Sequence, residues 1–380
     1  MQAKYGTGSI FKMPDGRYKW QGFFIDETGK RHRPSKIFKT ESEALRFQAE
    51  QLQKLEVEKA KKLNNAFTFG DIFIFWMDDV QTGKIKISET TRKNSIQNIN
   101  KHILPLYKNT PISKLNYIHF QRYIEQLKQQ GKSAKTIYNI YTDFKKIISY
   151  AIKREFIFED PLAKLEIEKP KAPKTPVNVL TLEEYKKIIE HPDNTHSWYF
   201  FPIVFLAETG LRVEELAIKK SDYITTPNGL SYVVINKAII RALKDDNKHT
   251  ELKVVDDLKT SGSTRKVPLN EKAKQVIEFQ MEYCKIEDIK SDFIFCTRTG
   301  GLIEKRSILR AFHKFCDNVG IEKRGLHSLR KLYINNTLQN GATPFDLAKI
   351  TGHSIQTMHK YYHDLDEDLL LKIAQQSEKK

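Results

Sequence analysis

A proline-rich segment near the middle of the chain limits the folds that it can adopt. The run Glu168-Lys-Pro-Lys-Ala-Pro-Lys-Thr-Pro-Val-Asn-Val179 holds three prolines within seven residues, which prevents a helix and favours an extended, semi-rigid spacer. Directly after it, Thr181-Leu-Glu-Glu184 has the pattern of a capping box that opens a helix. We therefore expect a linker at 168–179 and a separate domain at 180–380.

Two different patterns precede the linker, and a chain of 380 residues is long enough for two or three domains. Residues 1–65 predict a small sheet of three strands, the third from Lys30 to Lys39, followed by a helix after Thr40 and a charged connector. Residues 66–167 predict four helices, of which the last, after Ser133, has apolar side chains at a clear helical period.

The last domain is expected to be mostly helical, with strand-like segments around Ser231 and Arg265. The expected fold class is therefore mainly α with small β elements, an α+β protein. It combines an N-terminal three-stranded sheet with its helix, a helical middle domain, and a mixed but mostly helical last domain. Hydrophobic residues make up 39% of the chain, which is sufficient for such cores.

The chain is strongly basic, with a formal net charge of +17 distributed over every segment. This pattern favours a large polyanion as partner, although a basic surface can also serve solubility alone. No apolar run is long enough to span a membrane, and the N-terminus lacks an apolar signal-peptide core. We expect a cytoplasmic protein without membrane contact, whose Cys284, Cys296 and Cys316 are reduced, packed thiols.

Two groups of basic residues are candidates for contact with DNA. The first alternates with aromatic residues in the expected sheet, where it suits groove or backbone contact but also a merely solvated sheet: Arg17, Lys19, Arg31, Arg33 and Lys36. The second lies on the polar faces of the expected helices, which suits either a DNA clamp or a protein-binding bundle: Lys93, Lys135 and Lys145.

Polar side chains that suit phosphodiester chemistry recur in the last domain. They are Arg212 and Glu215 in Thr-Gly-Leu-Arg-Val-Glu-Glu, Lys259 before Ser-Gly-Ser, His327 and Arg330 in His-Ser-Leu-Arg, and His353 in Thr-Gly-His-Ser. Each has an ordinary alternative when taken alone. Arg212 can form a structural ion pair with Glu215, Lys259 can be solvated, and His327 with Arg330 can be a surface pair.

Tyr361 and Tyr362 follow His353 by eight and nine residues and supply a candidate nucleophile. A tyrosine hydroxyl has an unperturbed pKa of about 10, so it needs a positive, hydrogen-bonding environment to attack. The arginines, Lys259 and the histidines would supply that environment.

Taken together, these contexts resemble the tyrosine recombinase (phage integrase) family. The resemblance covers roughly residues 66–375 and includes Ser133-Ala-Lys-Thr136 and Asp160-Pro161. Residues 1–45 are more weakly similar to the arm-binding sheet of integrases of mobile genetic elements. The resemblance implies an arm-DNA-binding domain at 1–65, a core-binding domain at 66–167 and a catalytic domain at 180–380.

The implied activity is site-specific recombination, in which DNA strands are cut and rejoined through a 3′-phosphotyrosyl intermediate and a Holliday junction for integration or excision of the element. The implied roles are phosphate binding by Arg212, Arg330 and His353, protonation of the leaving 5′ oxygen by Lys259, proton transfer by His327, and orientation of neighbours by Glu215. The family's Tyr-x-His pattern would select Tyr361 as nucleophile, whereas the spacing from His353 selects Tyr362, which we favour.

The implied partners are double-stranded DNA with core and arm sites, three further copies of the chain in a tetramer, and an excisionase or host DNA-bending protein, all at the nucleoid. The reaction keeps the phosphodiester energy in the covalent bond, so no ATP, metal ion or other cofactor is expected. The alternatives are a type IB topoisomerase and a non-catalytic DNA-binding regulator. A zinc site at His359 and His363 lacks an evident third ligand.

Overall fold

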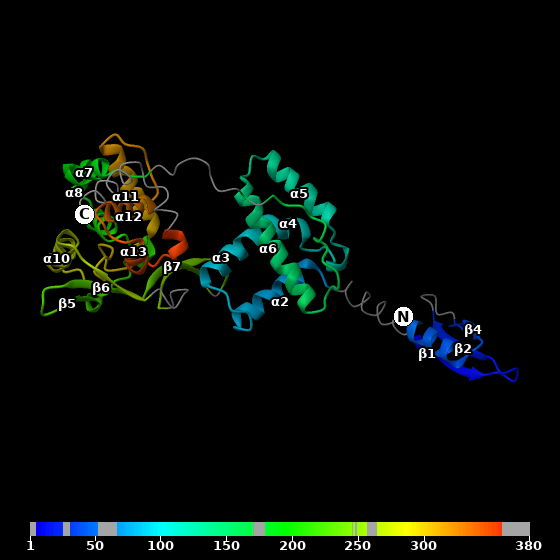
Figure 1. Ribbon diagram of the computed structural model, residues 1–380. Helices are drawn as coiled ribbons and strands as arrows, with labels where there is room; N and C mark the ends of the chain where they lie inside the picture. The colour runs from blue at the N-terminus through cyan, green and yellow to red at the C-terminus, as the bar shows by residue number, and fades with distance from the viewer. Residues whose placement is uncertain are drawn as a thin grey trace, which may run out of the picture. The chain divides into compact units, whose positions relative to one another are not determined.

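The computed structural model describes residues 5–25, 31–51, 67–168, 170, 179–244, 246–247, 249–256 and 264–358. The chain divides into two compact units, one of Met1–Ile87 with Asn94–Lys171 and one of Ser88–Lys93 with Ala172–Lys380. Helices predominate and the sheets are small and antiparallel (Figure 1), so the expected α+β class is confirmed. Within the described parts of the chain, no helix combines the length and apolar character needed to cross a membrane.

The N-terminal sheet has four strands, with the second at its centre. They are β1 (Tyr5–Lys12), β2 (Tyr18–Ile25), β3 (Arg31–His32) and β4 (Ser35–Phe38). Strand β2 pairs with β1 on one edge and with β3 and β4 on the other. The expected third strand is thus split in two at Arg33–Pro34, because proline has no N–H to donate to the ladder; the Pro34 carbonyl still accepts from Gly22 at 2.8 Å.

The two faces of this sheet separate its basic residues. The helix at residues 41–51 covers the Trp20 face, where the Trp20 and Phe47 rings meet edge to face at 5.1 Å. Lys36 pairs with Trp20 in register and lies over the Phe47 ring at 4.8 Å. Lys19 pairs with Ile37 and with Phe11 on the opposite face, where Phe11 and Ile37 are exposed. Lys36 therefore belongs to the packed face and Lys19 to the open one.

Residues 67–168 form a mainly helical region (Figure 1), which belongs to the first unit except for Ser88–Lys93 of the second. Its helical segments are α2 (Phe69–Gln81), α3 (Glu89–Asn98), the π turn η1 (Ile99–Ile103), α4 (Leu104–Tyr107), the 3-10 turn η2 (Ile112–Lys114), α5 (Tyr117–Gln129) and α6 (Ala134–Lys153). Thr68, Asn116 and Ser133 cap α2, α5 and α6 through their side chains. The second expected helix ends in the π turn, where Pro105 cannot donate the next helical hydrogen bond.

An aromatic stack fills the centre of this helical domain. The Phe144 ring of α6 lies 4.5 Å from the Phe120 ring, 5.2 Å from Phe69 and 5.5 Å from Tyr107, measured between centroids. Phe144 is 1% exposed. The stack joins α2, α4, α5 and α6, so the apolar face seen in the sequence of α6 is the core of the domain.

The second unit is mostly helical. Its helices are α7 (Leu182–Glu190), α8 (Pro192–Thr195), α9 (Phe200–Thr209), α10 (Glu271–Ile286), α11 (Lys305–Asn318), α12 (His327–Gln339) and α13 (Pro344–Thr351). Helix α9 is apolar on all sides, since it packs between α10 and α12 at the centre of the core. The capping box expected at Thr181 and Glu184 is present.

The strands of this unit form two small sheets. Strands β5 (Tyr223–Thr225), β6 (Ser231–Ile235) and β9 (Arg265–Pro268) make one, in the order β5-β6-β9. Strands β7 (Ala238–Leu243) and β8 (Thr250–Val255) make a separate hairpin. The strands at Ser231 and Arg265 were expected, but the hairpin between them was not, although exposed Glu251 and Lys253 alternate with less exposed residues along β8.

Truncating the aromatic stack should destabilise the helical domain. Phe144→Ala leaves a cavity among three rings, and we expect a loss of about 3–5 kcal/mol in its free energy of unfolding. Hydrogen exchange of the amides of α2, α5 and α6 in the full-length protein measures this domain separately. The matched control is Phe158→Ala, because Phe158 is 63% exposed and should change stability by no more than about 0.5 kcal/mol. Similar losses in both variants would contradict the assignment of the core.

Candidate active site

Arg212 is held in a short turn after α9. Gly210 ends the helix at φ +63°, and a Cβ atom there would lie 2.3 Å from the Tyr333 ring, so only glycine fits. The chain then makes a single 3-10 turn, η3 (Val213–Leu216). Its third residue, Glu215, accepts from the Arg212 backbone N–H at 2.8 Å and from Nη1 at 2.9 Å. The turn therefore fixes both ends of Arg212.

Arg330 approaches from the first turn of α12 and is buried, at 1% exposure. Its Nη1 donates to the Gly210 carbonyl at 2.7 Å, and its Nη2 donates to the Thr351 carbonyl at 2.5 Å. Nη2 also lies 3.1 Å from Nδ1 of His353. Arg330 thus joins the turn after α9 to the C-terminal end of α13.

The turn after α13 brings the two arginines together. Gly352 ends α13 in the left-handed region at φ +67°. Its carbonyl accepts from Nη2 of Arg212 at 2.9 Å, next to the Thr351 carbonyl that accepts from Arg330. His353 follows directly, and its Nδ1 lies 3.0 Å from the Thr351 hydroxyl. Arg212, Arg330 and His353 therefore converge on one short backbone segment, residues 351–353.

Glu215 is a buried carboxylate shared by two arginines. Besides Arg212, it binds Arg265, with Nη2–Oε2 at 2.7 Å and Nη1–Oε1 at 3.1 Å. Burial alone would raise the pKa of Glu215, but hydrogen bonds and charge from Arg265 and Arg212 outweigh it, so its pKa lies below the usual value. Arg265 was expected only as part of a strand. No local pattern marks it beyond a basic residue at the start of β9.

Both candidate histidines are held in their neutral form. Burial lowers the pKa of His353 to about 3, with further lowering by the charges of Arg330 and Arg212. Burial also lowers the pKa of His327, again assisted by Arg330. A neutral imidazole can accept a proton or donate one hydrogen bond. The positive field that opposes protonation of both rings is the field that would attract an anion.

The remaining expected site residues are placed as follows. Lys259, Tyr361 and Tyr362 lie outside the described residues, as do His359 and His363. On α6, Lys135 and Lys145 are exposed, with the Lys145 ammonium 5.8 Å from the Tyr141 ring, and Lys93 is half-buried on α3. In the N-terminal sheet, Arg31 and Arg33 are exposed, whereas Arg17 is paired with Asp15 at 2.6 Å.

The cysteines are buried and unbridged. Sγ of Cys284 lies 3.9 Å from Sγ of Cys296, and Cys316 is buried in the main core cluster of the second unit. Among the described residues, no group of three or more His, Cys, Asp or Glu side chains is arranged to hold a metal ion.

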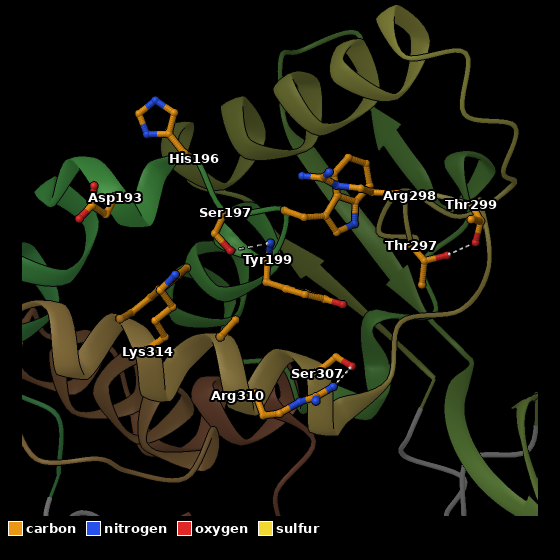
Figure 2. Close-up of a pocket in the computed structure, with 13 residues that line it drawn as sticks. Asp193, His196, Ser197, Tyr199, Thr297, Arg298, Thr299, Ser307, Arg310 and Lys314 are labelled. Atoms are coloured by element: carbon orange, nitrogen blue, oxygen red, sulfur yellow. Dashed lines mark hydrogen bonds between the residues drawn. The ribbon is translucent and has the colours of Figure 1, made fainter.

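A groove on the second unit carries basic and aromatic side chains but none of the candidate catalytic residues. It has a volume of about 860 Å³ and is lined by Trp198, Arg298, Arg310 and Lys314, among others (Figure 2). The Arg298 guanidinium lies over the Trp198 ring at 5.8 Å, and Arg310 donates to the Ser307 hydroxyl at 3.3 Å. The candidate catalytic residues that the structure describes lie instead on the turns after α9 and α13 and at the start of α12.

Comparison with known proteins identifies the family. Residues 178–368, half of the chain, match the model of the phage integrase family, and residues 68–128 match the model of the phage integrase N-terminal SAM-like domain. The tyrosine recombinase XerC-like protein of Caldanaerobacter subterraneus subsp. tengcongensis is 25% identical, over 87% of each chain. The ICEBs1 integrase of Bacillus subtilis is 24% identical, over 94% of this chain and 95% of the relative.

A solved structure shares the fold. The Tn1549 transposon integrase, solved in complex with transposon right end DNA, aligns with 82% of this chain and 99% of its own, at a TM-score of 0.61 and 19% identity. The matched phage integrase segment contains Arg212, Glu215, His327, Arg330 and His353. This chain therefore belongs to the phage integrase family and is a tyrosine recombinase.

Proposed function

We propose that this recombinase cuts and rejoins DNA at a phosphodiester held between Arg212 and Arg330, in the integration and excision of a mobile genetic element. One observation carries the proposal. Two guanidinium groups from segments far apart in the sequence meet at the carbonyls of Thr351 and Gly352, beside a histidine whose pKa is lowered by burial and by their charge. Such a cluster is costly for a protein to assemble unless an anion occupies it.

The arginines suit the two charged non-bridging oxygens of a phosphodiester. Negative charge on these oxygens grows as the phosphorus becomes five-coordinate, and fixed guanidinium forks stabilise that state more than the ground state. Arg330 is buried and rigidly bonded, whereas the Arg212 side chain is 39% exposed. Arg212 is thus the more accessible of the two guanidinium groups that we propose to hold the phosphate.

The proposed reaction is a transesterification. The Tyr362 oxygen bonds to phosphorus, the bond from phosphorus to the 5′ oxygen breaks, and a 3′-phosphotyrosyl link remains. His327 in its neutral form accepts the tyrosine proton, and Lys259 gives a proton to the leaving 5′ oxygen. His353 donates a hydrogen bond to the phosphate, and Glu215 orients Arg212. The bond energy stays in the phosphotyrosine, so the reverse attack by a 5′ hydroxyl rejoins DNA without ATP or a metal ion.

Strand exchange requires several copies of this site. Two duplexes exchange two strand pairs through a Holliday junction, and each of the four cuts uses one tyrosine. We therefore assign a homotetramer on double-stranded DNA, assisted by an excisionase or a host DNA-bending protein at the nucleoid of the cytoplasm. The Tn1549 integrase, which was solved on transposon DNA, supports DNA as the partner.

The proposal also assigns a role to each segment of the chain. Residues 1–65 bind arm DNA, 66–167 bind the core site, 168–179 link, and 180–380 catalyse. The open face of the N-terminal sheet, with Lys19, suits phosphate contact better than the packed face with Lys36. Exposed Lys135 and Lys145 on α6 suit the core-binding role.

The nucleophile can be tested directly. Tyr362→Phe removes one hydroxyl, so folding and DNA binding should survive while covalent adducts on a nicked core-site duplex disappear. Tyr361→Phe is the matched control and should still form adducts. The reverse result would make Tyr361 the nucleophile. Adducts with both single variants would refute a single tyrosine nucleophile, and a wild-type protein that binds DNA without adducts would indicate a non-catalytic regulator.

The role of Lys259 predicts rescue by a better leaving group. A 5′-thiolate has a much lower pKa than a 5′-alkoxide and leaves without protonation. We expect Lys259→Ala to slow adduct formation by about 100-fold on an ordinary phosphodiester, and to slow it little when sulfur replaces the bridging 5′ oxygen. Single-turnover rates on the two duplexes measure this. Equal loss on both would exclude Lys259 as the general acid.

The neutral state of His353 predicts acid sensitivity. Its folded pKa of about 3 lies below the unfolded value, so below about pH 6.5 the unfolded chain takes up a proton that the folded protein excludes. The free energy of unfolding should therefore fall as the pH decreases from 7 to 5. His353→Gln should make this fall shallower, with His327 causing the remainder in the same direction. Thermal melting across this pH range measures the slopes, and equal slopes would contradict the assignment.

A further inference from the structure

We infer that Arg265 is a positioning residue of the recombination reaction, which places Arg212 and the His353 turn at the same time. The inference rests on the proposed function of Arg212 and His353. Among the described residues, Arg265 binds the two structures that hold Arg212 and His353. Those structures are the Glu215 carboxylate and the backbone at the C-terminal end of α13.

The first link runs through Glu215, whose two oxygens are each shared by both arginines. Oε1 accepts from Nη1 of Arg212 at 2.9 Å and from Nη1 of Arg265 at 3.1 Å. Oε2 accepts from the Arg212 backbone N–H at 2.8 Å and from Nη2 of Arg265 at 2.7 Å. The fork of Arg265 therefore sets the plane of the carboxylate, and the carboxylate sets the place of Arg212.

The second link runs to the turn that carries His353. Nε of Arg265 donates to the Ile350 carbonyl, in the last turn of α13, at 2.6 Å. A Cβ atom on Gly352 would lie 3.2 Å from Nη1 of Arg265, so the guanidinium packs directly against that glycine. The carbonyl of Gly352 is the one that accepts from Arg212. Arg265 thus contacts the turn on which both arginines and His353 converge.

Burial separates this role from that of a phosphate ligand. The Arg265 side chain is 6% exposed, against 39% for Arg212. Arg265 is also the first residue of β9 and pairs with Ile235 of β6, so its backbone is fixed by the sheet. A lysine would keep the charge but could not make the forked contact with Glu215 and the Ile350 contact together.

Loss of the fork should therefore misplace Arg212 without unfolding the unit. A displacement of about 1 Å in a positioned group can cost about 100-fold in rate. The reaction rate should fall most on a substrate with a charged phosphate, because Arg212 acts on its non-bridging oxygens. A substrate with less charge on those oxygens should depend less on Arg265.

The experiment compares full-length wild type with Arg265→Lys on two nicked core-site duplexes. One has an ordinary scissile phosphodiester, and the other has a neutral methylphosphonate there. We expect Arg265→Lys to reduce the single-turnover rate of adduct formation by about 100-fold on the phosphodiester, and by less than about 10-fold on the methylphosphonate. Arg265→Ala should show the same selectivity with a larger loss. If it does not fold, the lysine variant decides alone.

The matched control is Lys237→Met. It removes another partly buried ion pair of the same unit, Lys237–Asp222 at 3.3 Å, whose carboxylate otherwise accepts from the Lys219 backbone. It should change both rates by the same factor. The inference would be overturned if Arg265→Lys reacted at the wild-type rate on both duplexes, or if its rate fell by the same factor on both. In either case, adduct formation by the wild type would still support the proposed function. If the wild type formed no adduct, both the proposed function and this inference would be refuted.

Discussion

The second unit depends on one buried carboxylate. Glu215 is 4% exposed and holds two arginines that come from segments distant in the sequence. A buried charge is tolerated only when it is paired and hydrogen-bonded, and removal of one partner leaves the other uncompensated. Glu215 therefore ties the turn after α9 to strand β9, and through Arg265 to the turn after α13. The placement of Arg212 is a result of this pairing rather than of its own short motif.

The same pairing leaves a net positive centre. Arg212 and Arg265 share one buried carboxylate, and Arg330 adds a third guanidinium beside them. The imidazoles of His327 and His353 remain neutral because burial and nearby positive charges lower their pKa. Backbone carbonyls at Gly210, Thr351 and Gly352 stabilise the guanidinium groups with dipoles and leave their charge uncancelled. This preformed positive centre is what electrostatic preorganisation requires of the proposed phosphate site.

The N-terminal unit shows how packing sorts residues that look equivalent in sequence. The basic residues of the sheet alternate with aromatics, but register places Lys36 over the Phe47 ring and Lys19 on the opposite face. Arg17 is neutralised by Asp15. In the helical domain the sequence was more informative, because an amphipathic helix such as α6 shows its buried face in its own period, and the Phe144 stack lies on that face.

The sequence by itself determined the fold class, the helices around Ser133 and Thr181, and the motifs that carry Arg212, His327, Arg330 and His353, because periodicity, caps and short motifs are local signals. Only the tertiary structure decided that these motifs meet and that Arg265 joins them. It also decided that the third strand of the first sheet splits at Pro34 and that η3 is a single turn. The decisive contacts span 140 residues from Arg212 to Gly352, 120 from Arg330 to Gly210, and 50 from Arg265 to Glu215. Local patterns cannot specify such pairs, since packing of the whole unit brings them together.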